Sequence, residues 1–337
     1  MKPLPEPSAT AAPPLPASRP GFVRREWLPI ILFVLLALLP FAAMLGPEKY
    51  TLSLVTRVMI FALAAISLDL ILGYGALVSF GHAAFLGIGG YAVGILAAHG
   101  FQDAALQMPV ALLASGLFAL LTGAISLRTK GVYFIMITLA FGQMAFFFAI
   151  SLSAYGGDDG LTLASRSKLF GLSWLENDRF FYGLVLALLI GCYALTRAIV
   201  ASRFGRVIRG AKENPVRMEA VGFSPFRYQL AAYVISGMIC GLAGVLLANQ
   251  AEFVAPAYMA WQRSGELIVM VILGGLGSLH GAIIGAAAFL LLEEILSGYT
   301  EHWKLIFGPF LVLVVLFARG GLLGILARVR GKSGRGR

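Results

Sequence analysis

The sequence is poor in charged residues. Only 12% of its 337 residues are Asp, Glu, Lys or Arg, whereas 59% are hydrophobic. A typical soluble domain carries about 25% charged residues. The composition therefore excludes a soluble globular protein and predicts an all-α integral membrane protein that crosses the bilayer many times.

Cysteine and catalytic motifs are scarce as well. Cys192 and Cys240 are the two cysteines, and both lie in apolar segments. They suggest neither a disulfide framework nor a metal site, so we expect packing roles. We find no Ser-His-Asp set, no H-E-x-x-H motif and no paired intramembrane aspartates, so we expect neither catalytic residues nor a metal.

One short motif resembles the end of a phosphate-binding loop. It is Gly331-Lys332-Ser333 in the basic C-terminal tail, residues 320–337. Leu326 stands where the loop needs its first glycine, and neither a strand before it nor a helix after it is predicted. We therefore expect this chain to bind no ATP or other cofactor itself.

Apolar windows predict about ten transmembrane or re-entrant helices between a disordered tail, residues 1–26, and the C-terminal tail. The first window is too long for a secretory signal, so we expect an uncleaved helix. The transmembrane domain would cover residues 27–319. The windows are 27–46, 51–72, 78–98, 108–127, 132–152, 180–200, 229–250, 264–279, 281–297 and 303–318.

Basic residues are distributed unevenly between the two sides of this predicted topology. With a cytoplasmic N-terminus, 19 of the 26 Lys and Arg residues lie on one side. This pattern satisfies the positive-inside rule with both termini in the cytoplasm. It also explains the net charge of +10 without a nucleic-acid partner.

Glycine-rich stretches interrupt two of the apolar regions. One stretch runs from Leu72 to Gly87 and contains Ser79 and His82, and the other runs from Leu273 to Gly285 and contains Ser278. The two stretches resemble each other and form a weak internal repeat in parallel orientation. Broken helices at corresponding places in two halves are typical of a transport pathway. Small residues spaced by four also favour close helix packing, and that alternative stays open.

Polar residues inside the predicted spans are the other pathway candidates. His82 either hydrogen-bonds a substrate or packs against a backbone carbonyl, and Gln143 lies in the fifth span. Asp69 and Arg57 lie on one helix about 18 Å apart, too far to pair with each other. Each either faces the protein interior or extends to the membrane surface.

The longest cytoplasmic loop covers residues 202–229. Asn214 and Pro215 are typical of a helix N-terminus, so we expect a short helix from Val216 to Val221 that stops at Gly222. Such a helix is suited to docking against another protein. Anchoring of the loop to anionic lipid is the alternative.

Four signatures make the chain resemble the LivM-type permease family, the membrane subunits of ATP-binding-cassette importers for branched-chain amino acids. The resemblance covers about residues 50–325. The signatures are the glycine-rich stretch from Leu72 to Tyr91, Ser202-Arg-Phe-Gly-Arg206 leading to Glu213-Asn214, Glu219-Ala-x-Gly222, and Leu273-Gly-Gly-x-Gly-Ser278.

The candidate residues fall into two groups. The glycine breaks, the repeat and the polar position in the fifth span make Ser79, His82, Ser278 and Gln143 our candidates for the substrate pathway. The resemblance implies that the 202–229 loop docks on an ATPase, and we expect Asn214, Arg217, Glu219 and Gly222 to form its docking segment. Val221 departs from the general importer pattern, which has a second alanine after Glu219-Ala220.

The resemblance also implies partners and a location. These are a homologous second permease, two cytoplasmic P-loop ATPases that hydrolyse ATP, and a periplasmic or extracellular solute-binding protein, in the bacterial inner membrane. Relatives also import urea, amides or aromatic acids, so the substrate stays open. An ion-coupled secondary transporter is the other alternative, and it would need no ATPase.

Overall fold

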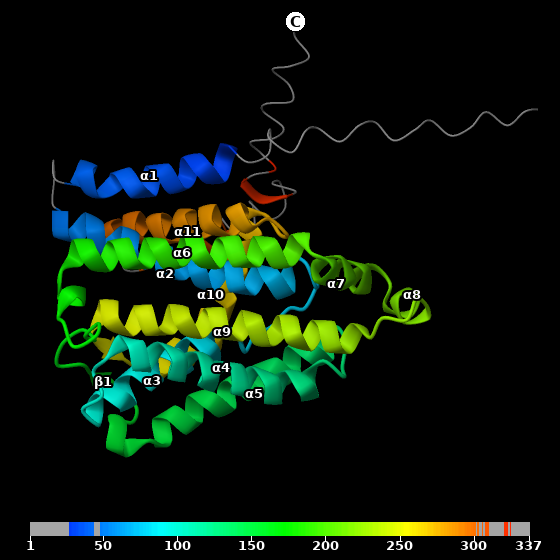
Figure 1. Ribbon diagram of the computed structural model, residues 1–337, viewed down its shortest axis with the longest axis horizontal. Helices are drawn as coiled ribbons and strands as arrows, with labels where there is room; N and C mark the ends of the chain where they lie inside the picture. The colour runs from blue at the N-terminus through cyan, green and yellow to red at the C-terminus, as the bar shows by residue number, and fades with distance from the viewer. Residues whose placement is uncertain are drawn as a thin grey trace, which may run out of the picture.

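The computed structural model describes residues 27–43 and 48–300, together with 302, 305, 307–309, 320–322 and 324. Figure 1 shows long helices lying side by side as a bundle. The helices are α1 (Trp27–Ala43), α2 (Glu48–Leu72), α3 (His82–Ala98), α4 (Ala104–Ser126), α5 (Val132–Ser151), α6 (Asp178–Ala201), α7 (Arg203–Glu213), α8 (Pro215–Ala220), α9 (Pro225–Ala251), α10 (Trp261–Gly274) and α11 (Leu279–Tyr299).

The helices confirm the predicted all-α membrane fold. Nine of the ten predicted windows coincide with described helices. The tenth, 303–318, lies mostly outside the described residues, as do the tail 1–26 and most of 320–337. Within the described ranges, α2, α4, α5, α6, α9 and α11 are long and apolar enough to cross a membrane.

Among the apolar helices of the described residues, α10 is too short to cross alone. The hydrocarbon core is about 30 Å thick. The 14 residues of α10 extend only about 21 Å at 1.5 Å per residue. The break between α10 and α11, at residues 275–278, confirms the prediction that glycines divide this region into a pair of helices, of which α10 is the short one. The 17-residue α3 follows a similar break after α2.

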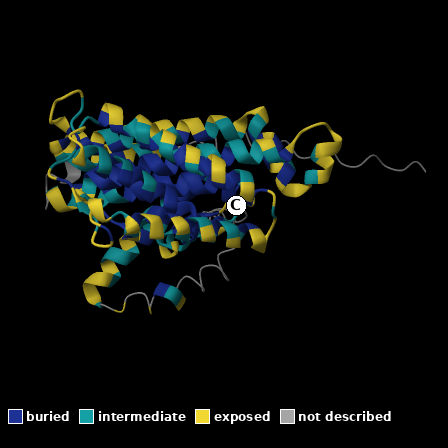
Figure 2. Cartoon of the chain, turned by 90° about the horizontal axis from the view of Figure 1, so that it is seen from below, coloured by how far each residue is buried: buried dark blue, intermediate teal, exposed yellow. Residues whose placement is uncertain are grey.

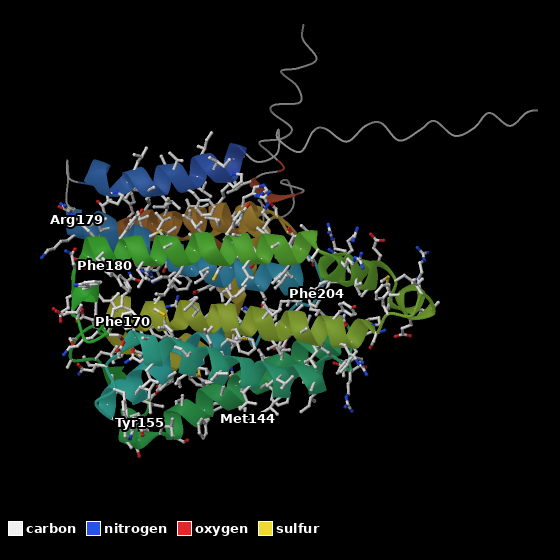
Figure 3. The ribbon with its side chains drawn as sticks, in the orientation of Figure 1. Met144, Tyr155, Phe170, Arg179, Phe180 and Phe204 are labelled. Atoms are coloured by element: carbon white, nitrogen blue, oxygen red, sulfur yellow. The ribbon has the colours of Figure 1, made fainter. Side chains whose placement is uncertain are left out.

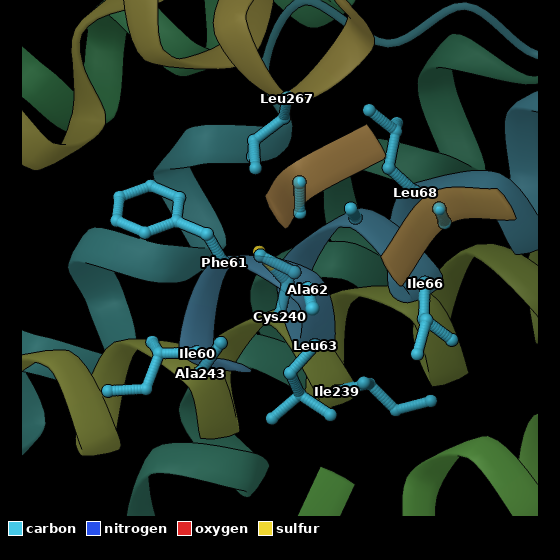
Figure 4. Close-up of a cluster of buried hydrophobic side chains, with 14 of the residues drawn as sticks. Ile60, Phe61, Ala62, Leu63, Ile66, Leu68, Ile239, Cys240, Ala243 and Leu267 are labelled. Atoms are coloured by element: carbon cyan, nitrogen blue, oxygen red, sulfur yellow. The ribbon is translucent and has the colours of Figure 1, made fainter. Parts of the chain in front are cut away.

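The core forms around α2 and α9. Every residue of α2 from Val58 to Leu72 is buried, and so is every residue of α9 from Ile239 to Asn249. Figure 2 shows this buried interior along the middle of the bundle, and Figure 4 shows apolar side chains of the two helices gathered with Leu267 of α10. The outer helices instead expose apolar side chains, as a bilayer requires.

Glycines allow the central helices to approach closely. A Cβ on Gly89 of α3 would lie 2.0 Å from the carbonyl oxygen of Gly241 on α9, and one on Gly244 would lie 1.9 Å from that of Leu86. A Cβ on Gly285 would lie 1.9 Å from the carbonyl oxygen of Met270, where α10 and α11 cross. For these glycines the packing interpretation is confirmed.

The segment between α5 and α6 covers one end of the bundle. It contains the 3₁₀ helices η2 (Ser153–Tyr155) and η3 (Trp174–Glu176), and its strand β1 (Leu161–Thr162) pairs with β2 (Phe253–Val254), just before η4 (Pro256–Met259). Ser167 anchors it, because its Oγ lies 2.5 Å from Gln107 Oε1 and its N–H donates to Asn249. A cavity of about 150 Å³ lies beside this anchor.

The opposite end of the bundle carries α7 and α8. Figure 1 shows α7 continuing past the end of α6 beside the start of α9, with α8 outermost. The α4–α5 turn, with Arg128 and Lys130, lies at this same end, because α5 crosses the bundle once before α6 returns. Basic residues therefore gather at one end of the described chain, the end predicted to be cytoplasmic.

Candidate functional site

The two glycine-rich turns touch each other inside the protein. The amide N–H of Gly277 in the α10–α11 turn donates to Asp69 Oδ1 of α2 at 2.8 Å. A Cβ on Gly73 would lie only 2.4 Å from the Gly277 nitrogen, so neither turn can move without affecting the other. Asp69 is fully buried, which resolves its placement in favour of the protein interior.

The α2–α3 turn, residues 73–81, is irregular backbone held by other helices. The N–H of Phe80 donates to Thr138 Oγ1 of α5 at 3.3 Å. Just after the turn, the N–H of Ala83 donates to Ser264 Oγ of α10 at 3.0 Å, which satisfies a free donor at the start of α3. These bonds hold the turn against α5 and α10, and Gly73, Gly75, Ser79 and Gly81 within it are buried.

His82 lies fully buried at the start of α3. Its Nε2 lies 2.9 Å from Ser67 Oγ of α2, and its ring packs edge-on against Phe85 with centroids 5.3 Å apart. Its backbone carbonyl accepts a bond from Cys240 of α9. In this conformation His82 joins three helices, and its predicted pathway role would require a state that opens this interior.

The two predicted pathway serines lie in different environments. Ser79 is fully buried, and its hydroxyl has no hydrogen-bond partner among the described residues. Ser278 is half-buried and caps α11, because its Oγ accepts the N–H of Gly281 at 3.2 Å. Ser278 therefore stands at the turn contact, next to Gly277, whereas Ser79 stands inside the α2–α3 turn.

Gln143 lies apart from these residues, on α5. It is half-buried near the middle of the helix, on a face where Met136, Ala140, Met144 and Phe147 are exposed. Figure 3 shows Met144 at the edge of the bundle. The structure therefore separates the predicted pathway residues into a buried group at the turns and one residue on an outer face.

Arg57 illustrates the other predicted membrane charge. Its Nη2 lies 3.9 Å from Glu293 Oε1 of α11, and its side chain is partly exposed. The pair places the arginine near the end of the bundle opposite α7 and α8. The two predicted membrane charges therefore lie in different environments. Asp69 is buried, whereas Arg57 is partly exposed and pairs with Glu293.

The predicted coupling segment forms two helices. On α7, Gly205, Val207, Ile208 and Ala211 are buried, so this helix packs against the bundle. The short α8 then stands away from it, and no residue of α8 is buried. The segment therefore has a fixed base and an exposed tip.

The predicted helix boundary at Asn214 is confirmed. Asn214 Oδ1 accepts the N–H of Arg217 at 2.9 Å, and Pro215 is the first helical residue. Gly222 follows the helix with a φ of 90°, a conformation that favours glycine. Arg217 and Glu219 are exposed on the tip, so both are free to meet another molecule.

Sequence reasoning missed Lys212. Its Nζ, on α7, donates to the carbonyl oxygen of Gly73 in the α2–α3 turn at 2.8 Å. In the sequence, Lys212 is a lysine in the last turn of a charged helix. Lysine is common there because it interacts favourably with the helix dipole, so the position is not distinctive. Its partner, Gly73 at the end of α2, lies 139 residues away in the sequence, so only the fold reveals the contact.

Comparison with known proteins agrees with this architecture. The family described as "Branched-chain amino acid transport system / permease component" matches residues 50–317. No solved structure matches the chain.

Several transport proteins are similar in sequence. The "High-affinity branched-chain amino acid transport system permease protein LivM" of Escherichia coli K12 is 26% identical over 92% of this chain and 77% of its own length. LivH of the same organism is 32% identical over 39% of this chain and 43% of its own. BraD of Pseudomonas aeruginosa is 26% identical over 78% of this chain and 91% of its own.

Proposed function

The chain belongs to the family of branched-chain amino acid transport system permease components, and we propose that it forms half of the translocation pore of an ATP-binding-cassette importer for branched-chain amino acids. The family is one of transport components, and the chain is not an enzyme. Its bundle of spanning helices makes it a multi-pass membrane protein.

The exposed tip at α8 is the observation that carries this proposal. This short charged helix rests on α7 through Met218, which lies against Gly210, and none of its residues is fully buried. Here α8 is capped by Asn214 and ended by Gly222, and it presents Arg217 and Glu219 together with the apolar Val216 and Val221. Apolar side chains among charges on an ordered helix suit a protein partner better than a lipid surface.

The importer needs partners that this chain does not supply. Two cytoplasmic P-loop ATPases would dock on the α7–α8 segment and hydrolyse ATP, since the permease itself binds none. A homologous second permease would complete the pore, and a solute-binding protein outside the inner membrane would deliver the substrate. The relatives include two different permease proteins, LivM and LivH, and this supports a pore built from two different permeases.

Gln143 marks the face of α5 that we assign to the pore. An amide facing lipid without a partner costs about 1–3 kcal/mol. A half-buried glutamine in the middle of a spanning helix is therefore best explained by a water-filled path or by the second permease. In the proposed cycle, ATP binding by the partners shifts this path between outward-open and inward-open states.

Isolation of the complex tests the proposed partners. The tagged chain, purified from its native membrane in mild detergent, should bring a second permease and P-loop ATPases in comparable amounts by mass spectrometry. A chain carrying both Arg217→Glu and Glu219→Arg should stay in the membrane and lose the ATPases. Isolation of the unaltered chain without an ATPase would overturn the importer in favour of a secondary transporter.

A further inference from the structure

Lys212 connects the base of the coupling segment to the interior of the bundle. Its Nζ lies 2.8 Å from the carbonyl oxygen of Gly73. Carbonyls in the last turn of a helix lack intrahelical partners and carry the negative end of the helix dipole, so an ammonium group is favoured there. The contact is therefore a specific one between α7 and the end of α2.

The carbonyl that Lys212 holds belongs to the residue at the contact between the two turns. A Cβ on Gly73 would lie 2.4 Å from the Gly277 nitrogen, so Gly73 cannot carry a side chain without displacing Gly277, whose own φ of 74° favours glycine. Asp69, one turn before Gly73, accepts the N–H of Gly277 at 2.8 Å. A cation on one side and a carboxylate on the other thus hold the same pair of glycines.

The same turn also reaches the buried side of α5, the helix that carries Gln143. At its other end, Phe80 donates to Thr138 of α5. A Cβ on Gly81 would lie 2.2 Å from the carbonyl oxygen of Thr138, so turn and helix are in direct contact. Gln143 lies five residues further along α5, about 7.5 Å up the helix. One continuous chain of contacts therefore runs from α7 to α5.

We propose that Lys212 is a positioning residue that transmits movement of the α7–α8 segment to the two glycine turns, and through Thr138 to α5, the helix that carries Gln143. The inference rests on the proposed function, because it assigns the link between ATPase docking and the pore. Asp69 keeps the two turns moving as one unit, and Lys212 ties that unit to the coupling segment.

The test compares Lys212→Met with Lys212→Arg in the reconstituted complex. Methionine retains the length of the side chain and removes the charged donor, whereas arginine keeps a donor. Lys130→Met, at an exposed lysine of the α4–α5 turn, controls for loss of a cytoplasmic charge. The measured quantity is substrate imported per ATP hydrolysed.

We expect Lys212→Met to lower this ratio about fivefold, a size typical of residues that carry coupling between sites. Binding-protein-stimulated ATP hydrolysis and subunit composition should stay near those of the unaltered complex. Lys212→Arg should restore most of the ratio, and Lys130→Met should not change it. An unchanged ratio in Lys212→Met would overturn the proposal, and so would loss of the ATPases, because Lys212 would then be a docking residue.

Hydrogen exchange of the permease provides a second readout that does not depend on assembly or transport. Amides of residues 73–81 and 275–281 should exchange faster in Lys212→Met than in Lys130→Met. Equal exchange would contradict the link. If the unaltered complex imported no substrate with ATP, the proposed function would be wrong. The exchange rates would still test whether Lys212 links α7 to the two turns.

Discussion

At the scale of single residues, glycine has two separable roles in this chain. At Gly89 and Gly244 it removes a side chain that would collide with a backbone carbonyl of the facing helix. At Gly275 and Gly277, with φ of 116° and 74°, it also permits a left-handed backbone in the α10–α11 turn. The first role holds α3 against α9, and the second shapes the contact that Asp69 completes.

The packing role predicts a loss of stability for Gly244→Ala. Its new methyl group would meet the carbonyl oxygen of Leu86 at 1.9 Å, so α3 and α9 must separate. Such overpacking costs about 1–3 kcal/mol. Gly191→Ala, on an exposed position of α6 with open space around it, is the matched control and should be neutral or stabilising. Thermal unfolding in one detergent compares the two, and equal melting temperatures would contradict the account.

The pore assignment predicts a transport defect for Gln143→Leu. Leucine has nearly the same size and removes the amide, so uptake should fall about threefold to tenfold, the value of one hydrogen bond. Met144→Leu on the neighbouring exposed position conserves volume and should keep uptake. Both proteins should unfold at the same temperature as the original. Full uptake by Gln143→Leu would remove this face of α5 from the pathway.

Individual site residues were harder to predict than the segments that contain them. The motif pattern singles out His82 and Ser79, but burial depends on which helices surround them, and that is a tertiary property. Lys212 has no distinctive local pattern, since its partner Gly73 is distant in sequence. Asn214 was predictable because its partner, the N–H of Arg217, is only three residues away.

At the scale of elements, the boundaries follow local chemistry closely. Asp103, Asn177, Asn214 and Ser278 each accept an N–H in the first turn of the helix that they precede. Glycines with left-handed φ follow α8 and lie in the turn after α10. Capping and turn chemistry involve neighbours in sequence, so helix positions and the break near Gly274 could be predicted. The approach of the two turns could not, because it joins residues 208 positions apart.

The cap of α8 provides a prediction at this scale. Asn214→Ala should destabilise the N-terminus of α8 by about 1 kcal/mol. Because a helix of six residues is marginal by itself, this loss should disorder the tip that we assign to the ATPase. We expect ATP hydrolysis stimulated by the binding protein to fall with the permease still folded.

Asn177→Ala is the matched control for that experiment. Asn177 is also an asparagine N-cap, of α6, and its Oδ1 accepts the N–H of Arg179 at 3.0 Å. It lies at the opposite end of the bundle from α8. The ATPase should therefore respond to Asn214→Ala and not to Asn177→Ala, and an equal response to both would mean that the tip is not the docking site.

At the scale of the whole molecule, the two ends of the bundle are built differently. One end is covered by the α5–α6 segment, which buried hydrogen bonds to Gln107 and Asn249 hold in place. Arg166 reinforces it with an ion pair to Asp178 at 2.7 Å. The other end carries α8, which has no buried residue. A fixed cover at one end and an exposed docking element at the other suit a subunit that meets a solute-binding protein outside and an ATPase inside.

ATP-driven uptake by the reconstituted complex tests the central claim most directly. The complex is placed in sealed vesicles with ATP inside, and loaded binding protein is added outside. We expect labelled leucine, isoleucine or valine to accumulate only with hydrolysable ATP, and to do so in the presence of ionophores that abolish ion gradients. Accumulation that needs no ATP and disappears with the ionophores would show an ion-coupled transporter and contradict the account.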